Sequence, residues 1–177
     1  MRTLILIAAL AFPSSWALAQ EHGPELGLGI GGMNLTFSGD DPVFSINVNE
    51  PFVSLAFYTS PKVAVEPSAT LSFLATDGGT VLVALLGVNV PIYSQETWGR
   101  SGFYFSPGLD IIFLGTSGGG GNTATQLGLG MDVGTKIPVM DAVSFKVGGG
   151  AAYRLENDTF SDGLILSGLV GISVFFP

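Results

Sequence analysis

Six charged residues stand inside segments that otherwise alternate between apolar and small residues, and they are the residues best placed to do chemistry. They are three acids and three bases: Glu66, Asp110, Asp132, Lys136, Lys146 and Arg154. By the alternation, each shares a strand face with small or polar residues rather than with the apolar residues of its segment. Opposite charges that meet in a confined interior can pair, and pairing limits the free-energy cost of removing them from water. We therefore predict a charge cluster with a structural role, while a relay of protons or ions through the same groups remains the alternative.

The residues that catalysis or metal binding would need are scarce. Nucleophilic hydrolysis usually needs a nucleophile and a histidine base, and the one histidine, His22, has no serine at a recognisable spacing. A single His and no Cys also argue against a zinc site. The four glycines at residues 118–121 lack the Lys-Ser/Thr pair of a phosphate-binding loop. We predict no catalytic residue, no metal and no cofactor.

The composition excludes several classes of protein. The chain has 177 residues, of which 47% are hydrophobic, 11% are charged and 26 are glycines, with no Cys and a formal net charge of −8. The apolar content excludes an intrinsically disordered chain, and the lack of Cys excludes a disulfide scaffold. The negative charge argues against nucleic acid as a partner, because it repels phosphate. The length fits one domain.

The first residues have the features of a secretory signal peptide. Arg2 supplies a positive charge, residues 4–12 are apolar, and Ala17 and Ala19 form a small-x-small cleavage pattern. The apolar run is shorter than the roughly 20 residues that a membrane-spanning helix needs. We predict a signal peptide at residues 1–19 and a single mature domain at residues 20–177.

The mature chain shows the period of a β-strand almost throughout. Apolar residues recur at every second position, which is typical of strands with two different faces. In residues 126–138 one face carries Leu127, Leu129, Met131, Val133 and Ile137. Eight segments show this pattern, with turn residues between them: 26–31, 43–59, 63–75, 80–92, 102–114, 126–138, 143–154 and 164–176. Pro67 and Pro107 lie inside two of the segments and each needs a bulge or a local gap in the strand pairing.

The second face of these strands is unusual for a protein in water. It carries mostly Gly, Ser and Ala instead of the Lys, Glu, Thr and Arg that keep a solvated sheet surface hydrated. Small residues suit a confined interior, so the apolar rows are expected to face lipid. The pattern predicts an all-β, eight-stranded, antiparallel up-and-down transmembrane barrel, whose interior is just wide enough for side chains to fill. A soluble lipocalin-like binding barrel, with an apolar interior, is the alternative architecture.

The mature chain resembles the small eight-stranded outer-membrane barrels, the OmpA/OmpX-like porin-family group of Gram-negative bacteria. The resemblance rests on the signal peptide, the eight alternating segments and the closing apolar run of residues 166–176. It implies a location in the outer membrane with both termini in the periplasm, and contact with outer-membrane lipid and lipopolysaccharide. The final aromatic strand of that group implies recognition by the barrel-assembly machinery, although Pro177 after Phe176 departs from the pattern.

Loop charges and aromatic residues fit this orientation. The loops expected outside carry only acids: Asp40, Asp41, Asp77, Glu156, Asp158 and Asp162. Aromatic residues near strand ends are expected to form interfacial girdles: Phe52, Phe57, Tyr58, Tyr93, Trp98, Phe103, Phe113, Tyr153, Phe160, Phe175 and Phe176. We expect a monomeric, non-enzymatic barrel that contributes to envelope structure or surface contacts. An outer-membrane enzyme that modifies lipid is the alternative function.

Overall fold

The computed structural model describes residues 23–38, 41–45, 50–76, 79–117, 123–156 and 162–176. The predicted signal peptide, the glycine run at 118–121 and several other residues named above lie outside these ranges: His22, Asp40, Asp77, Asp158, Phe160 and Pro177. No helix in the described ranges is long and apolar enough to cross a membrane.

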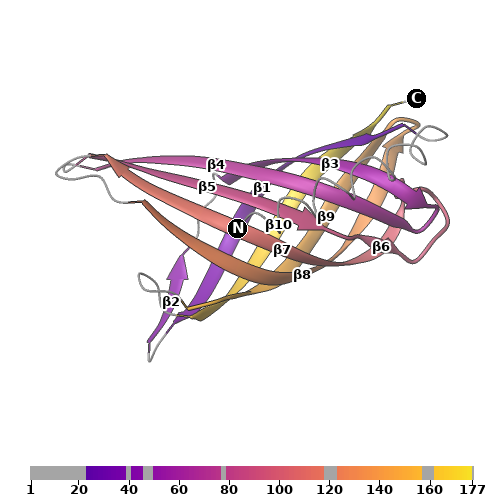
Figure 1. Ribbon diagram of the computed structural model, residues 1–177. Coiled ribbons are helices and arrows are strands. Elements are labelled where there is room, and N and C mark those ends of the chain that lie inside the picture. Colours follow the sequence, from indigo (N-terminus) through magenta and orange to yellow (C-terminus); the bar gives the residue numbers. More distant parts are fainter. Residues whose placement is uncertain are drawn as a thin grey trace, which may run out of the picture.

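The described ranges contain ten strands, which make up one sheet. They are β1 (Glu25–Ser38), β2 (Asp41–Ser45), β3 (Glu50–Ser60), β4 (Val63–Thr76), β5 (Gly79–Asn89), β6 (Ile92–Tyr93), β7 (Gly102–Ser117), β8 (Thr123–Met140), β9 (Val143–Arg154) and β10 (Gly163–Phe175). Two of these are short additions: β2 pairs with the second half of β1, and β6 pairs with β4 and β7. The other eight are the long strands that form the wall in Figure 1.

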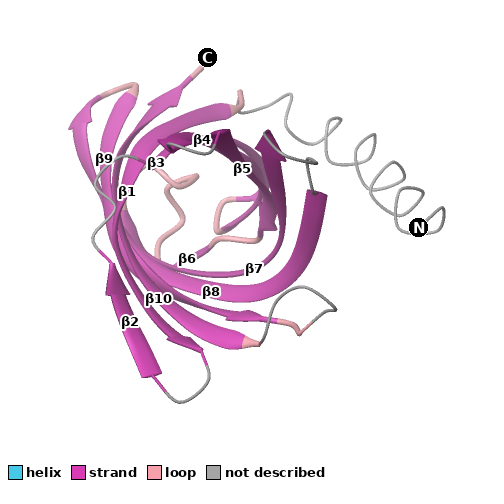
Figure 2. Ribbon diagram, turned by 90° about the vertical axis from the view of Figure 1, so that its left-hand side faces the viewer, coloured by secondary structure: helices cyan, strands magenta, loops and turns pink. Residues whose placement is uncertain are grey.

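The eight long strands close into a barrel. Neighbours along the chain pair antiparallel in the order β1, β3, β4, β5, β7, β8, β9 and β10, and β10 pairs with β1. Glu25 at the start of β1 faces Phe175 at the end of β10, so β1 begins and β10 ends at the same end of the barrel. The view down the barrel in Figure 2 shows the resulting ring of strands. The predicted fold, a closed eight-stranded antiparallel barrel, is confirmed.

Both prolines predicted to disturb a strand lie where the strand pairing is interrupted on one side. Pro67 lies in a short gap of the β3–β4 ladder, while its pairing with β5 continues. Pro107 lies opposite the break between β5 and β6, and its carbonyl oxygen accepts a hydrogen bond from the Val90 N–H at 2.9 Å. Each proline therefore lacks its N–H where a regular ladder is already absent.

The outer surface of the barrel wall is apolar. Along β7 and β8, most outward-facing side chains are large, apolar and exposed: Phe103, Phe105, Leu109, Ile111, Phe113, Leu127, Leu129, Met131, Val133 and Ile137. The buried residues between them are polar or small. A soluble lipocalin-like barrel would have the opposite faces, with its apolar residues inside.

Four of the aromatic residues expected in the interfacial girdles lie inside the barrel, and one of them, Phe52, lines the lumen cavity. Tyr58, Tyr93 and Phe175 are buried. Strand alternation accounts for this, because Tyr58 shares its face with the buried Ser54 and Phe175 shares its face with the buried Ser173. Position near a strand end was therefore a weaker guide than the face on which the residue lies.

We expect cysteines at two neighbouring positions of β8 to report opposite environments. Leu129 is 49% exposed on the outer wall, and Gly130 lines the lumen. In lipid vesicles, a maleimide probe that partitions into the hydrocarbon should label Leu129→Cys and leave Gly130→Cys unlabelled. A Cβ at Gly130 meets its neighbours at ordinary contact distances of 3.6 Å or more, so the variant should fold. The reverse labelling pattern would show that the two faces are assigned backwards.

Candidate functional site

The first layer of the lumen lies at the barrel end where β1 begins and β10 ends, which we call the terminal end. We call it the terminal layer, and it consists of Glu25, Tyr58, Tyr93, Lys136 and Phe175. Lys136 forms an ion pair with Glu25, which also accepts a hydrogen bond from the Tyr58 hydroxyl. The Lys136 ammonium also lies 5.1 Å from the ring centroid of Tyr93 and 5.6 Å from that of Phe175. Carboxylate, hydroxyl and aromatic faces together replace the water that these charges have lost.

A second layer, the middle layer, lies next along the barrel axis and consists of Ser54, Glu66, Tyr104 and Lys146. The Lys146 Nζ lies 3.2 Å and 3.4 Å from the two carboxylate oxygens of Glu66. The Ser54 hydroxyl donates to Glu66 Oε1 at 2.5 Å, and the Lys146 ammonium lies 5.1 Å from the Tyr104 ring centroid. This buried carboxylate thus receives hydrogen bonds from two directions, as a desolvated charge requires.

The two lysines are direct neighbours with different partners. Lys136 and Lys146 face each other across the β8–β9 ladder. Like charges at such a position repel each other. The repulsion is offset because Glu25 reaches Lys136 from β1 and Glu66 reaches Lys146 from β4, neither of which pairs with β8 or β9. Both ion pairs therefore cross the lumen and connect separate parts of the barrel wall.

Glycines make room for the large side chains of the lumen. The Tyr104 ring lies so close to Gly134 and Gly148 that a Cβ on either residue would overlap its hydroxyl. These glycines sit opposite each other on β8 and β9. The high glycine content of the inward face thus has a packing role at this point of the barrel.

A third ion pair lies further along the lumen. Arg154 on β9 pairs with Asp110 on β7, and the two strands are separated by β8. The pair passes over Gly128, where a Cβ would overlap both the guanidinium and the carboxylate. Gly128 is thus the residue that allows the charges of β7 and β9 to meet across β8.

Asp132 differs from the other lumen acids. It lies on the inward face of β8, opposite Gly150 of β9. Within the part of the chain that the structure describes, no base lies within 4 Å of its carboxylate, since Lys136, Lys146 and Arg154 each pair with another acid. Asp132 is therefore the lumen carboxylate without an ion-pair partner.

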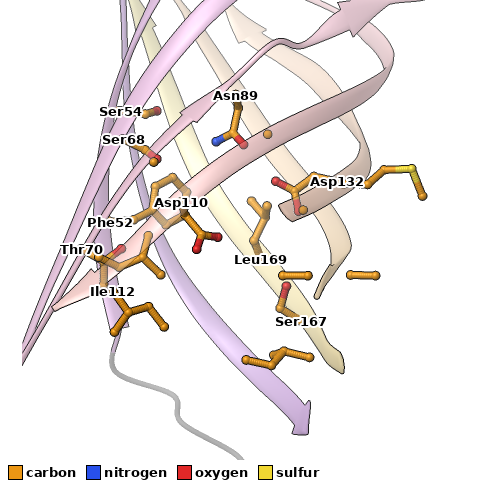
Figure 3. A pocket seen from close by; sticks show the side chains of 18 of the residues that line it. Phe52, Ser54, Ser68, Thr70, Asn89, Asp110, Ile112, Asp132, Ser167 and Leu169 are labelled. Atoms are coloured by element: carbon orange, nitrogen blue, oxygen red, sulfur yellow. The ribbon is translucent and has the colours of Figure 1, made fainter. Parts of the chain in front are cut away.

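A cavity of about 390 Å³ occupies the lumen beyond the middle layer. Its polar lining includes Ser54, Glu66, Ser68, Asn89, Asp110, Asp132, Lys146, Arg154 and Ser167. Its apolar lining includes Phe52, Val83, Leu85, Ile112, Ile165 and Leu169. Figure 3 shows Asn89, Asp110 and Asp132 from three strands pointing into the same space. The lumen is therefore filled toward the terminal end and hollow beyond the middle layer.

The loop between β6 and β7, residues 94–101, lies across the terminal end. The Trp98 N–H donates to the Pro61 carbonyl at 3.0 Å, and the Trp98 ring packs edge-on against Tyr58 at 6.3 Å between centroids. On the other side, the Arg100 carbonyl accepts a hydrogen bond from the Ser144 hydroxyl at 2.5 Å. Loop segments are visible through the ring of strands in Figure 2. This loop connects the β3–β4 turn with β9 and covers the terminal layer.

The path of the loop depends on a left-handed backbone. Trp98 has a φ of 53° and Gly99 has a φ of 69°. A Cβ at Gly99 would overlap the hydroxyl and ring of Tyr58. Glycine meets both demands, since it has no side chain and adopts positive φ without strain.

All six charged residues singled out from the sequence lie on the inward side of the barrel. Glu66, Lys146, Asp110 and Arg154 form pairs with one another, whereas Lys136 pairs with Glu25, which the sequence reasoning missed. Glu25 shares its strand face with Gly27 and Gly29, so extending the alternation by one position would have found it. Tyr58 and Tyr93, expected in the interfacial girdles, were also missed as lumen residues that surround the charges. Among the described residues, no three His, Cys, Asp or Glu side chains gather in a way that could hold a metal ion.

Comparisons with known proteins show the same fold in outer-membrane barrels. No protein-family profile matches the sequence, and no curated protein matches it. Neisserial surface protein A is 15% identical, with a TM-score of 0.69 over 87% of this chain and 97% of that one. The attachment invasion locus protein Ail of Yersinia pestis is 11% identical, with a TM-score of 0.53 over 86% and 97%. The N-terminal barrel domain of Pseudomonas aeruginosa OprF is 14% identical, with a TM-score of 0.54 over 86% and 96%. The chain thus has the fold of the small outer-membrane barrels.

Proposed function

We propose that this chain is a non-enzymatic barrel of a Gram-negative outer membrane, where it contributes to envelope structure or surface contacts. The observation that carries the proposal is the apolar wall, with exposed large apolar residues on every long strand whose side chains are described throughout. Such a wall is stable only in contact with lipid, since water would solvate it poorly. The likeness to three outer-membrane barrels supports the same location.

The orientation and partners in this proposal follow from the ends of the barrel. The end opposite the terminal end, which we call the loop end, carries Asp41, Glu156 and Asp162 among its described residues. We place this acidic end outside the cell and the terminal end in the periplasm. Outer-membrane lipid and lipopolysaccharide then contact the apolar wall, and the barrel-assembly machinery meets β10 during biogenesis. The chain acts as a monomer in this proposal.

A structural role agrees with the chemistry of the lumen. Among the lumen residues whose side chains are described, three of four carboxylates are held in ion pairs. A pair of carboxylates working as acid and base would need two such groups to converge without neutralising bases. The buried pairs instead connect strands that are not neighbours, which favours a rigid barrel over a reactive centre.

The expected behaviour of the purified mature protein tests the location. It should require detergent for extraction from membranes, and it should migrate differently on a gel before and after heating, because a folded barrel resists denaturation by detergent at room temperature. Recovery of the protein in the aqueous fraction without detergent would contradict the proposal.

The envelope role has its own experiment. Cells that lack the protein are compared with cells that carry it for uptake of a hydrophobic dye and for lipid composition. We expect increased dye uptake with no change in the acylation of lipid A. Release of fatty acid from lipid A by the purified protein, abolished by His22→Ala, would instead favour the lipid-modifying enzyme.

A further inference from the structure

We propose that the lumen cavity is a binding site for small organic cations that have an apolar portion. This inference goes beyond a structural role in the envelope. It rests on the charges, the polar groups and the apolar side chains that line this partly enclosed cavity.

The charges of the lumen do not balance. The described lumen holds four carboxylates, those of Glu25, Glu66, Asp110 and Asp132, and three bases, Lys136, Lys146 and Arg154. Each base pairs with one of the first three acids, so these described groups carry one excess negative charge, that of Asp132. In a partly enclosed space, where water screens less, a carboxylate attracts a cation more strongly than it does at the surface. The missing charge is therefore positive.

Hydrogen-bond acceptors accompany this carboxylate. Asn89 and Ser68 line the same cavity, and Figure 3 shows the Asn89 amide directed into it with Asp132. A primary ammonium has three N–H donors and needs several acceptors when it leaves water. A carboxylate, an amide oxygen and a hydroxyl can supply them.

The remaining walls select an apolar body on the cation. Leu85, Ile112 and Leu169 line the cavity together with the ring of Phe52. These side chains cannot replace the water around an inorganic ion. Contact between them and a hydrocarbon group is favourable, because it removes apolar surface from water. A carboxylate outside any ion pair beside apolar walls fits a small-molecule site, where a few polar groups fix the orientation of an apolar ligand.

The two ends of the barrel favour cations that arrive from the loop end. At that end the exposed residues Glu156 and Asp162 are acidic, and negative charges around an opening raise the local concentration of cations. The terminal end is filled by buried side chains, of which Glu25 and Lys136 are almost fully inaccessible. An anionic ligand would be repelled by the rim and by Asp132 alike.

Binding of phenethylammonium to the folded barrel tests the proposal. The full mature protein in detergent is titrated by calorimetry with phenethylammonium, and with neutral 2-phenylethanol and anionic phenylacetate as probes of the same shape. We expect saturable binding of the ammonium alone. Replacing Asp132 with Asn should weaken it about tenfold or more, the loss that follows removal of a charge-assisted hydrogen bond. Asp141→Asn makes the same charge change in the exposed β8–β9 turn, outside the cavity, and should leave the affinity unchanged.

A second variant tests the cavity without changing its charge. Gly130 lines the cavity and has room for a Cβ, so Gly130→Leu should fill part of the space and abolish binding while Asp132 remains. Gel mobility before and after heating verifies that each variant is folded, and it tests the membrane barrel separately from the ligand. Absence of saturable binding to the folded wild-type barrel would overturn the proposal. Equal binding of ammonium and alcohol, or an Asp132→Asn variant with unchanged affinity, would overturn it too.

Discussion

Replacing Lys136 with Met is expected to lower the free energy of unfolding of the barrel by about 3–5 kcal/mol, the usual cost of removing one partner of a buried ion pair. The Lys136 and Glu25 side chains are 0% and 1% exposed, so water cannot reach the carboxylate that the substitution leaves behind. The measurement is urea-induced unfolding in lipid vesicles. Fluorescence of Trp98 reports it, because this residue packs against Tyr58 of the terminal layer.

A surface lysine provides the matched control for this prediction. Lys62 also pairs with a glutamate, Glu96, at 3.4 Å, but the two side chains are 47% and 71% exposed. Exposed pairs of this kind contribute about 0–1 kcal/mol, so Lys62→Met should have little effect. The double variant Glu25→Leu with Lys136→Met should recover much of the lost stability, since it removes both charges. Equal effects of Lys62→Met and Lys136→Met would contradict a stabilising role for the terminal layer.

Placing arginine on the outer wall is expected to destabilise the barrel by about 2–4 kcal/mol when the position lies near the middle of the bilayer. Leu129 meets this condition, because it is exposed on the outer wall and lies in the middle of β8. The cost arises because the guanidinium must either leave water or deform the bilayer. Unfolding in vesicles of Leu129→Arg, compared with the wild type, measures it.

The same strand supplies a control for depth. Thr123 begins β8, shares the outward face with Leu129 and is exposed. An arginine there lies near the lipid–water boundary, where the expected cost is only about 0–1 kcal/mol. If both arginine variants were as stable as the wild type, the outer wall could not be in contact with hydrocarbon.

The fold could be predicted from the sequence because a barrel wall has a simple period. In β8, the alternation of Leu127, Leu129 and Met131 with glycines and Asp132 already assigns each residue to a face. The strands β7 and β8 extend a few residues beyond the predicted segments, since their ends pair with each other outside the apolar region. The sequence of a strand therefore predicts well which face each residue occupies, but it predicts the ends of the strand poorly.

The partners of the lumen charges could not be predicted in the same way. Lys136 pairs with Glu25 across the lumen, 111 residues away in the sequence. Which acid reaches which base depends on the stagger between strands around the closed barrel, and alternation within one strand contains no information about it. The equal number of acids and bases in the predicted cluster therefore hid the fact that, among the described residues, Asp132 forms no ion pair.

Because the terminal end is filled, the hollow part of the barrel is a cavity that opens only at the loop end. A solute that enters at the loop end must leave by the same route, because the Lys136–Glu25 pair and the loop at residues 94–101 stand between it and the far side. Occupancy then follows the concentration in one compartment only. We expect such a barrel to admit solutes from the loop end without passing them across the membrane.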